Sequence, residues 1–159
     1  MILQSWAAHS RPSMRKIFAP AKNSASANFA LLVLRFWIGL EMLVVHGVEK
    51  LVNFQSTSAE FPDPIGVGST VSLALVVFAE VVCSLFIILG LLTRGCALVL
   101  MINMSVAFFM VHKGALSGPH SGELALVYLM AYFVLFLAGP GRVSADRIFF
   151  GKNPAVQPH

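Results

Sequence analysis

Residues 71–92 read VSLALVVFAEVVCSLFIILGLL, an apolar run with a single charged side chain, Glu80. About 20 consecutive apolar residues suffice to cross the hydrocarbon core of a bilayer. The run therefore predicts a transmembrane helix. A carboxylate near its centre costs about 2.5–3.5 kcal/mol even on insertion scales. Glu80 thus needs a polar partner inside the protein or a functional role.

The composition of the whole chain also indicates a membrane protein. Of its 159 residues, 57% are hydrophobic and only 11% are charged, whereas soluble domains contain about 25% charged residues. The length suffices for one domain and leaves no room for a separate soluble catalytic module. The net charge of +4 does not indicate nucleic-acid binding, because the basic residues flank the apolar runs and form no single stripe.

Four apolar segments predict four membrane-spanning helices, because backbone polar groups in lipid must bond within their own helix. The segments are residues 29–51, 71–92, 95–111 and 123–138. The last segment is short, so the residues on either side of it must help it to cross a hydrocarbon core of about 30 Å. We predict an all-α fold, an antiparallel four-helix bundle in the membrane over residues 29–148. A flexible basic tail at residues 1–28 and a short tail at residues 149–159 are expected to flank it.

The distribution of Lys and Arg predicts the orientation, because cytoplasmic segments are enriched in basic residues. In a four-span protein, eight basic residues of the two tails and the turn at Arg94 share one side, whereas Lys50 and Lys113 lie on the other. Both termini are therefore expected in the cytoplasm. Residues 52–70 are expected outside, where so long and apolar a loop, with Phe61 and Pro62, should pack over the mouth of the bundle.

Several ionisable side chains lie at membrane depth, where such residues are functional candidates. Five residues of the first segment follow a spacing of four and three, which places them on one face of a helix. They are Arg35, Gly39, Met42, His46 and Glu49. We expect this face to point into the bundle.

Glu80 is expected to find its partner in this interior. His46 and Asn103 are the leading candidates, and Arg35 is less favoured because it lies about 14 Å nearer the cytoplasmic side. An alternative is that such bonds only hold the helices together, at about 0.6 kcal/mol each.

The other polar residues give weaker signals. Four are expected at the membrane interface rather than as ligands: Lys50, His112, Lys113 and His120. Tyr132 is a better candidate than Tyr128 for a buried hydroxyl donor. His46, Glu49 and Glu80 supply only two nearby ligands and one distant one, so no metal site is predicted. The absence of a C-x-x-C-H motif excludes covalent haem, and no flavin is expected.

Seven short strings occur in a defined order between residues 30 and 148. They are LRFWIGL (34–40), HGVEKL (46–51), FP (61–62), AEVVCSLFIILGLLTR (79–94), AFFMVH (107–112), ELALVYL (123–129) and AGPGRVSADR (138–147). Together they resemble the DoxX family of small four-span membrane proteins. Glu41 and residues 83–84 depart from that family, in which apolar residues and glycines are usual at these positions.

The resemblance implies a multi-pass protein of the bacterial cytoplasmic (inner) membrane. Members of the family resemble quinol- or catechol-linked proteins, subunits of membrane oxidoreductases, or helpers in assembling other membrane proteins. Two hypotheses follow. The chain is a quinone- or quinol-interacting subunit or accessory component of a membrane redox system, or it is a non-enzymatic scaffold or assembly factor for a larger membrane complex. Whether it is itself an enzyme stays open, because a fold supports many activities.

The quinone hypothesis assigns roles to particular residues. His46 and Glu80 are the candidate catalytic residues, since both can exchange protons. The candidate quinone-binding residues are Arg35, His46, Glu80, Asn103 and Tyr132. The quinone would be bound non-covalently. The expected partners are the lipid bilayer and other membrane protein subunits or a second copy of the chain, and no nucleic acid.

Overall fold

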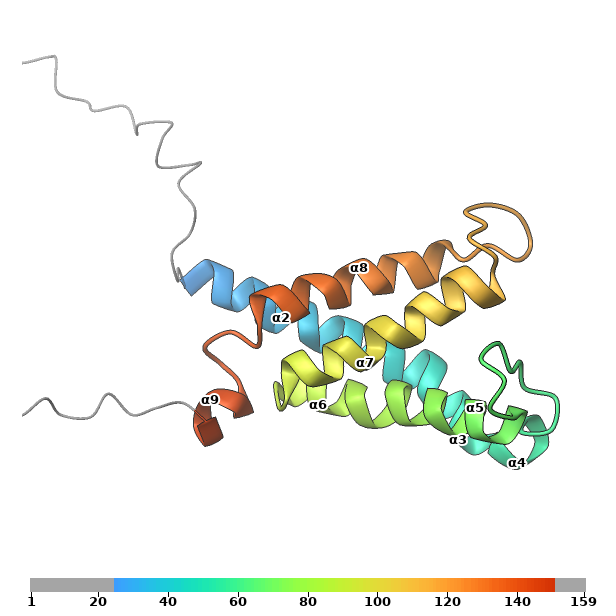
Figure 1. Cartoon of the computed structure of the whole chain (residues 1–159). Helices are drawn as coiled ribbons and strands as arrows, with labels where there is room; N and C mark the ends of the chain where they lie inside the picture. Colours follow the sequence, from blue (N-terminus) through green and yellow to red (C-terminus); the bar gives the residue numbers. More distant parts are fainter. Residues whose placement is uncertain (1–24, 151–159) are drawn as a thin grey trace, which may run out of the picture.

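A computed structural model describes residues 25–150, and within this range the chain forms helices and loops without any strand (Figure 1). The predicted all-α class is confirmed for this part of the chain. Of the two predicted tails, residues 1–24 and 151–159 lie outside the described residues.

Four long helices make up most of the fold, and three of them contain a π-helical segment. The first runs through α2 (Ala25–Glu41), η1 (Met42–Gly47) and α3 (Val48–Val52), and a short α4 (Phe54–Thr57) follows it. The second runs through α5 (Ser69–Val77), η2 (Phe78–Cys83) and α6 (Ser84–Leu89). The third consists of α7 (Thr93–Val106) and η3 (Ala107–Val111), the fourth is α8 (Glu123–Ala138), and a short α9 (Ala145–Phe150) ends the described chain.

Three of these helices are long and apolar enough to cross a membrane: Ala25–Val52, Ser69–Leu89 and Thr93–Val111. The helix α8 is apolar but shorter. The first helix begins four residues before its predicted start at residue 29, because residues 25–28 extend it without a break. The third begins at Thr93, two residues earlier than predicted.

The helices pack pairwise around an apolar core. Helix α8 lies along α7, and α2 packs against α6. The most deeply buried core side chains are Met42, Leu73, Ile87, Leu100, Tyr132 and Leu135. Both ends of the described chain lie at one end of the molecule, and the loops at residues 58–68 and 112–122 lie at the other (Figure 1).

Polar contacts tie the segment after α8 to the end of the molecule that carries the chain ends. The buried Arg35 guanidinium donates to the carbonyl oxygens of Pro140, at 2.6 Å, and Val143. The Asp146 carboxylate accepts from two backbone N–H groups at the start of α7, at 2.6 and 3.0 Å. These N–H groups have no partner within their own helix, so Asp146 caps α7 from a distant part of the chain.

Candidate functional site

A cavity of about 770 Å³ lies toward the end of the molecule that carries the longer loops. Its walls come from the first three long helices, from α8 and from the loop before α5, and they are predominantly apolar. Its volume lies within the range of roughly 300–1,000 Å³ that is usual for ligand sites. A small number of polar side chains converge on it, which is the usual composition of a small-molecule site.

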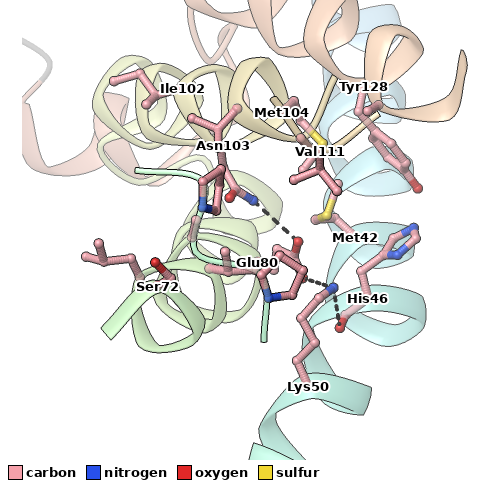
Figure 2. Close-up of a pocket in the computed structure, with 18 of the residues that line it drawn as sticks. Met42, His46, Lys50, Ser72, Glu80, Ile102, Asn103, Met104, Val111 and Tyr128 are labelled. Atoms are coloured by element: carbon pink, nitrogen blue, oxygen red, sulfur yellow. Dashed lines mark hydrogen bonds and ion pairs between the residues drawn. The ribbon is translucent and has the colours of Figure 1, made fainter. Parts of the chain in front are cut away.

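An ion pair forms the polar centre of the cavity. The Lys50 ammonium lies 2.7 Å from the Glu80 carboxylate, whose side chain is only 6% exposed. The Asn103 amide donates to the other carboxylate oxygen at 3.3 Å. Figure 2 shows Glu80 between these two partners, with Lys50 also directed at the backbone carbonyl of His46, 3.4 Å away. Glu80 therefore has donors from two helices, as a buried carboxylate requires.

Two aromatic side chains form the neighbouring wall. The His46 ring meets the Tyr128 ring edge-on, with 5.8 Å between centroids (Figure 2). Tyr128 lines the cavity and is buried, yet its hydroxyl has no hydrogen-bond partner among the described residues. Buried hydroxyls usually bond to protein or to something bound. The hydroxyl oxygen itself is enclosed by protein, with Glu41 close to it, so Tyr128 contributes its ring to the cavity wall.

The π-helical segments supply several residues of this site. Met42 and His46 belong to η1, Glu80 belongs to η2, and Val111 belongs to η3, and all four line the cavity. A π-helical turn adds a residue to the helix and often marks a functional site. Each of the first three long helices thus changes its winding where it meets the cavity.

The first two long helices approach closely at Gly47. A Cβ at this position would lie 2.8 Å from the Glu80 carbonyl oxygen, so only a glycine fits without movement. Gly39 makes a similar approach to the Ser84 carbonyl oxygen, at 3.1 Å. The tight crossing therefore depends on glycines of the first helix, whereas residues 83–84 of the second are Cys and Ser. This approach brings Lys50 within reach of Glu80.

The loop before α5 covers part of the cavity, as the sequence predicted. Phe61 and Pro62 are among the residues that line it. Asp63 holds the loop, since its carboxylate accepts from the Ser72 hydroxyl at 2.7 Å and from the backbone N–H groups of Val67 and Gly68. These bonds, the one from Ser72 foremost, lower the pKa of Asp63 below its ordinary value. The loop is thus fixed by an ionised Asp63.

The sequence-predicted site residues separate into two groups. His46, Glu80 and Asn103 line the cavity, and the predicted bond between Asn103 and Glu80 is confirmed. Within the described chain no hydrogen bond joins the His46 side chain to Glu80; the backbone carbonyl of His46 instead accepts from Lys50. The other two, Arg35 and Tyr132, do not line the cavity.

Arg35 and Tyr132 have other surroundings. Arg35 bonds to the segment after α8 and lies about 16 Å from His46 along the helix axis, at 1.5 Å per residue. Tyr132 is fully buried one helical turn beyond Tyr128, with their rings stacked 6.1 Å apart. Tyr128 therefore occupies the position predicted for Tyr132.

Two residues of the site, Lys50 and Tyr128, were not predicted from the sequence. Lys50 was expected at the interface, but it forms the ion pair with Glu80. Lys50 lies beside the face of the first helix that carries Arg35, His46 and Glu49. This position is the signal that could have identified it. Tyr128 was ranked below Tyr132 as a candidate, but Tyr128 lines the cavity and Tyr132 does not. Only the packing of α8 against its neighbours distinguishes Tyr128 from Tyr132.

Residues 30–113 match the DoxX family. The chain belongs to the DoxX family. The match to DoxX includes His46, Lys50, Glu80 and Asn103, so the whole polar centre lies within it, whereas Tyr128 lies beyond it. The chain is accordingly a small membrane protein with several apolar helices.

Two proteins of Haemophilus influenzae, both described as uncharacterized, are similar to this DoxX chain. One is 32% identical over 116 residues, covering 70% of this chain and 84% of that protein. The other is 31% identical over 126 residues, covering 75% and 82%. No solved structure matches the chain.

Proposed function

We propose that this protein binds the head of a quinone or quinol in the cavity and serves as a subunit or accessory component of a membrane redox system. The observation that carries the proposal is the Lys50–Glu80–Asn103 cluster inside an apolar cavity of a membrane protein. A purely structural bond between helices would not need a cavity of about 770 Å³ beside it.

The residues present suit a quinone head. Such a head is flat and apolar, with carbonyl oxygens that accept hydrogen bonds. The cavity has apolar walls for the ring and two donors that can reach an acceptor: the Lys50 ammonium and the Asn103 amide.

His46 and Glu80 are the proposed proton-exchanging groups. Imidazole is the side chain best suited to exchange protons near neutral pH. The His46 ring lines the cavity, and Lys50 connects its backbone to the Glu80 carboxylate. A bound quinone takes up two electrons and two protons when it is reduced to the quinol. The protons would pass through these residues, and the electrons would come from a redox centre of a partner subunit.

The proposal includes a topology. All four helices of the bundle cross the bacterial cytoplasmic membrane, including α8, which is the shortest of them. They form an antiparallel bundle over residues 29–148, with both termini in the cytoplasm. The excess of Lys and Arg in the tails and the 93–94 turn supports this orientation. A cysteine introduced at Ser56 and one introduced at Gln157 should then differ in their reactivity with an impermeant thiol reagent added to intact cells. Ser56 should react and Gln157 should not, and the reverse pattern would contradict the proposed orientation.

The test of function is ligand-induced stabilisation. The purified protein should melt at a higher temperature in the presence of a short-chain quinone. The His46→Ala and Glu80→Gln variants should fold and lose this response. His120→Ala is the matched control and should keep it, because His120 does not line the cavity. A well-folded parent protein that shows no response would favour the scaffold hypothesis, in which the polar cluster serves only to hold helices or a client protein.

A further inference from the structure

Three large apolar side chains of the second and third long helices line the cavity and are at least half exposed on the outer surface. Leu75, Phe78 and Ile102 are 52%, 50% and 58% exposed. They come from α5, η2 and α7. A side chain that lines a cavity and is half exposed lies at an opening of that cavity. The cavity therefore opens between the second and third long helices.

This opening lies at membrane depth. Ile102 is the central residue of the apolar helix Thr93–Val111, about 14 Å from either end at 1.5 Å per residue. Phe78 lies near the middle of the apolar helix Ser69–Leu89. In a bilayer both side chains face the hydrocarbon core, far from the headgroups. The opening thus leads to acyl chains and not to water.

The polar centre lies directly inside this opening. Asn103 follows Ile102 in the chain, and Glu80 follows Phe78 by two residues, so each helix presents an apolar residue outside and a polar residue inside. Figure 2 shows Ile102 at the edge of the site, on the side of Glu80 away from His46 and Tyr128. A molecule at the polar centre could extend past Ile102 into lipid.

The route toward the loop end is covered. Phe61, Pro62 and Pro64 of the loop before α5 line the cavity there, and Asp63 holds the loop through its bonds to Ser72 and two backbone N–H groups. Proline has a fixed φ and no N–H to offer a ligand. This side of the cavity is therefore apolar and comparatively rigid.

We propose that the opening between η2 and α7 is a lateral portal through which the ligand's apolar tail leaves the site into the bilayer. The ligand is an amphiphile whose polar ring lies against Glu80 and Asn103 and whose isoprenoid or alkyl tail passes Phe78 and Ile102. This inference rests on the proposed function, and it adds the class of ligand and its route of entry from the membrane.

The direct test is photo-cross-linking of the full chain in lipid nanodiscs. The probe is a benzoquinone whose alkyl tail carries a diazirine, and labelled peptides are identified by mass spectrometry. Label on the peptides that contain Phe78 and Ile102 is expected, and an excess of the same quinone without diazirine should remove most of it. The Glu80→Gln variant should lose the same label, because the head no longer anchors the tail.

Two matched substitutions test whether the width of the portal limits the binding of a ligand that has a tail. Ile102→Trp should narrow it and weaken binding of a decyl-benzoquinone about tenfold or more, while binding of the same head without a tail stays unchanged. Leu98→Trp is the control and should change neither, because Leu98 is exposed on the same helix, α7, at 44%, but does not line the cavity.

The outcomes separate the portal from the proposed function. If both quinones bind but the label falls on α8 or the loop, the portal is wrong and the proposed function stands. If a fatty acid carrying the same diazirine labels Ile102 equally and the quinone does not compete, Ile102 is only a lipid contact and the portal is wrong. If neither quinone binds the folded parent protein, both proposals are overturned.

Discussion

Removing the Lys50 ammonium should destabilise the protein strongly. In Lys50→Met the Glu80 carboxylate, 6% exposed, keeps only the Asn103 amide at 3.3 Å as a partner. Removing one partner of a buried ion pair costs about 3–5 kcal/mol. The Lys50 side chain is 25% exposed, so the pair is not fully desolvated. We therefore expect a loss near the lower limit, about 3 kcal/mol.

The opposite substitution should cost less. In Glu80→Gln the carboxylate is replaced by a neutral amide that can still accept from Asn103. The unpaired Lys50 lies near the end of its helix, and its flexible stem lets the ammonium turn toward water. We expect a loss of about 1 kcal/mol. The double variant should be more stable than the sum of the two losses indicates, by about 1–3 kcal/mol, because it contains no unpaired charge.

The free energies of unfolding can be measured by SDS titration in mixed micelles, followed by far-ultraviolet circular dichroism. Lys113→Met is the control, since Lys113 is exposed in a loop and such a substitution changes stability by no more than about 0.5 kcal/mol. Equal losses for Lys50→Met and Glu80→Gln, or strictly additive losses in the double variant, would show that the pair does not stabilise the fold in the way its geometry indicates.

Three further outcomes follow from other contacts. Gly47→Ala places a Cβ 2.8 Å from the Glu80 carbonyl oxygen and should cost about 1–3 kcal/mol in unfolding free energy, whereas Gly95→Ala, at an open position of α7, should be neutral or stabilising. Asp146→Ala removes the cap of α7 and should lower the melting temperature through a loss of about 1–2 kcal/mol, which a wild-type melting curve would contradict. The folded-state pKa of Asp63 is lowered, so its bonds to the loop are present above the unfolded pKa of about 3.9 and are lost as the pH falls through the folded value. Proteolysis of the loop should accordingly rise only below about pH 4 in the parent protein, and Asp63→Ala should show rapid cleavage already at neutral pH.

The sequence predicted the helices well because hydropathy reports burial in lipid directly. The predicted segment, residues 71–92, overlaps most of the helix Ser69–Leu89, and the predicted loop over the mouth does line the cavity through Phe61 and Pro62. The bond between Asn103 and Glu80 followed from depth alone, since both side chains lie near the middle of their helices. A single sequence is thus enough to predict which segments form helices and at what relative depth their residues lie.

The arrangement of side chains around each helix could not be predicted in the same way. Counting along a regular helix assumes 3.6 residues per turn, but η1, η2 and η3 are more loosely wound. Each such segment rotates the residues beyond it relative to those before it. A shared face also does not ensure a shared site: Arg35 and His46 lie about 16 Å apart along the helix axis, so His46 lines the cavity whereas Arg35 bonds to the segment after α8.

Lys50 shows a second limit of counting, because the reach of a side chain is as important as the position of its Cα. Asn103 has a short side chain and must lie level with Glu80 to bond with it. Lysine has a long apolar stem that can lie along a helix while its ammonium extends by several ångströms. Lys50 follows His46 by one helical turn and still bonds to both the His46 carbonyl and the Glu80 carboxylate. A lysine near the end of a transmembrane helix is therefore a candidate partner for a carboxylate that lies a turn or more deeper, even where its sequence position indicates only the interface.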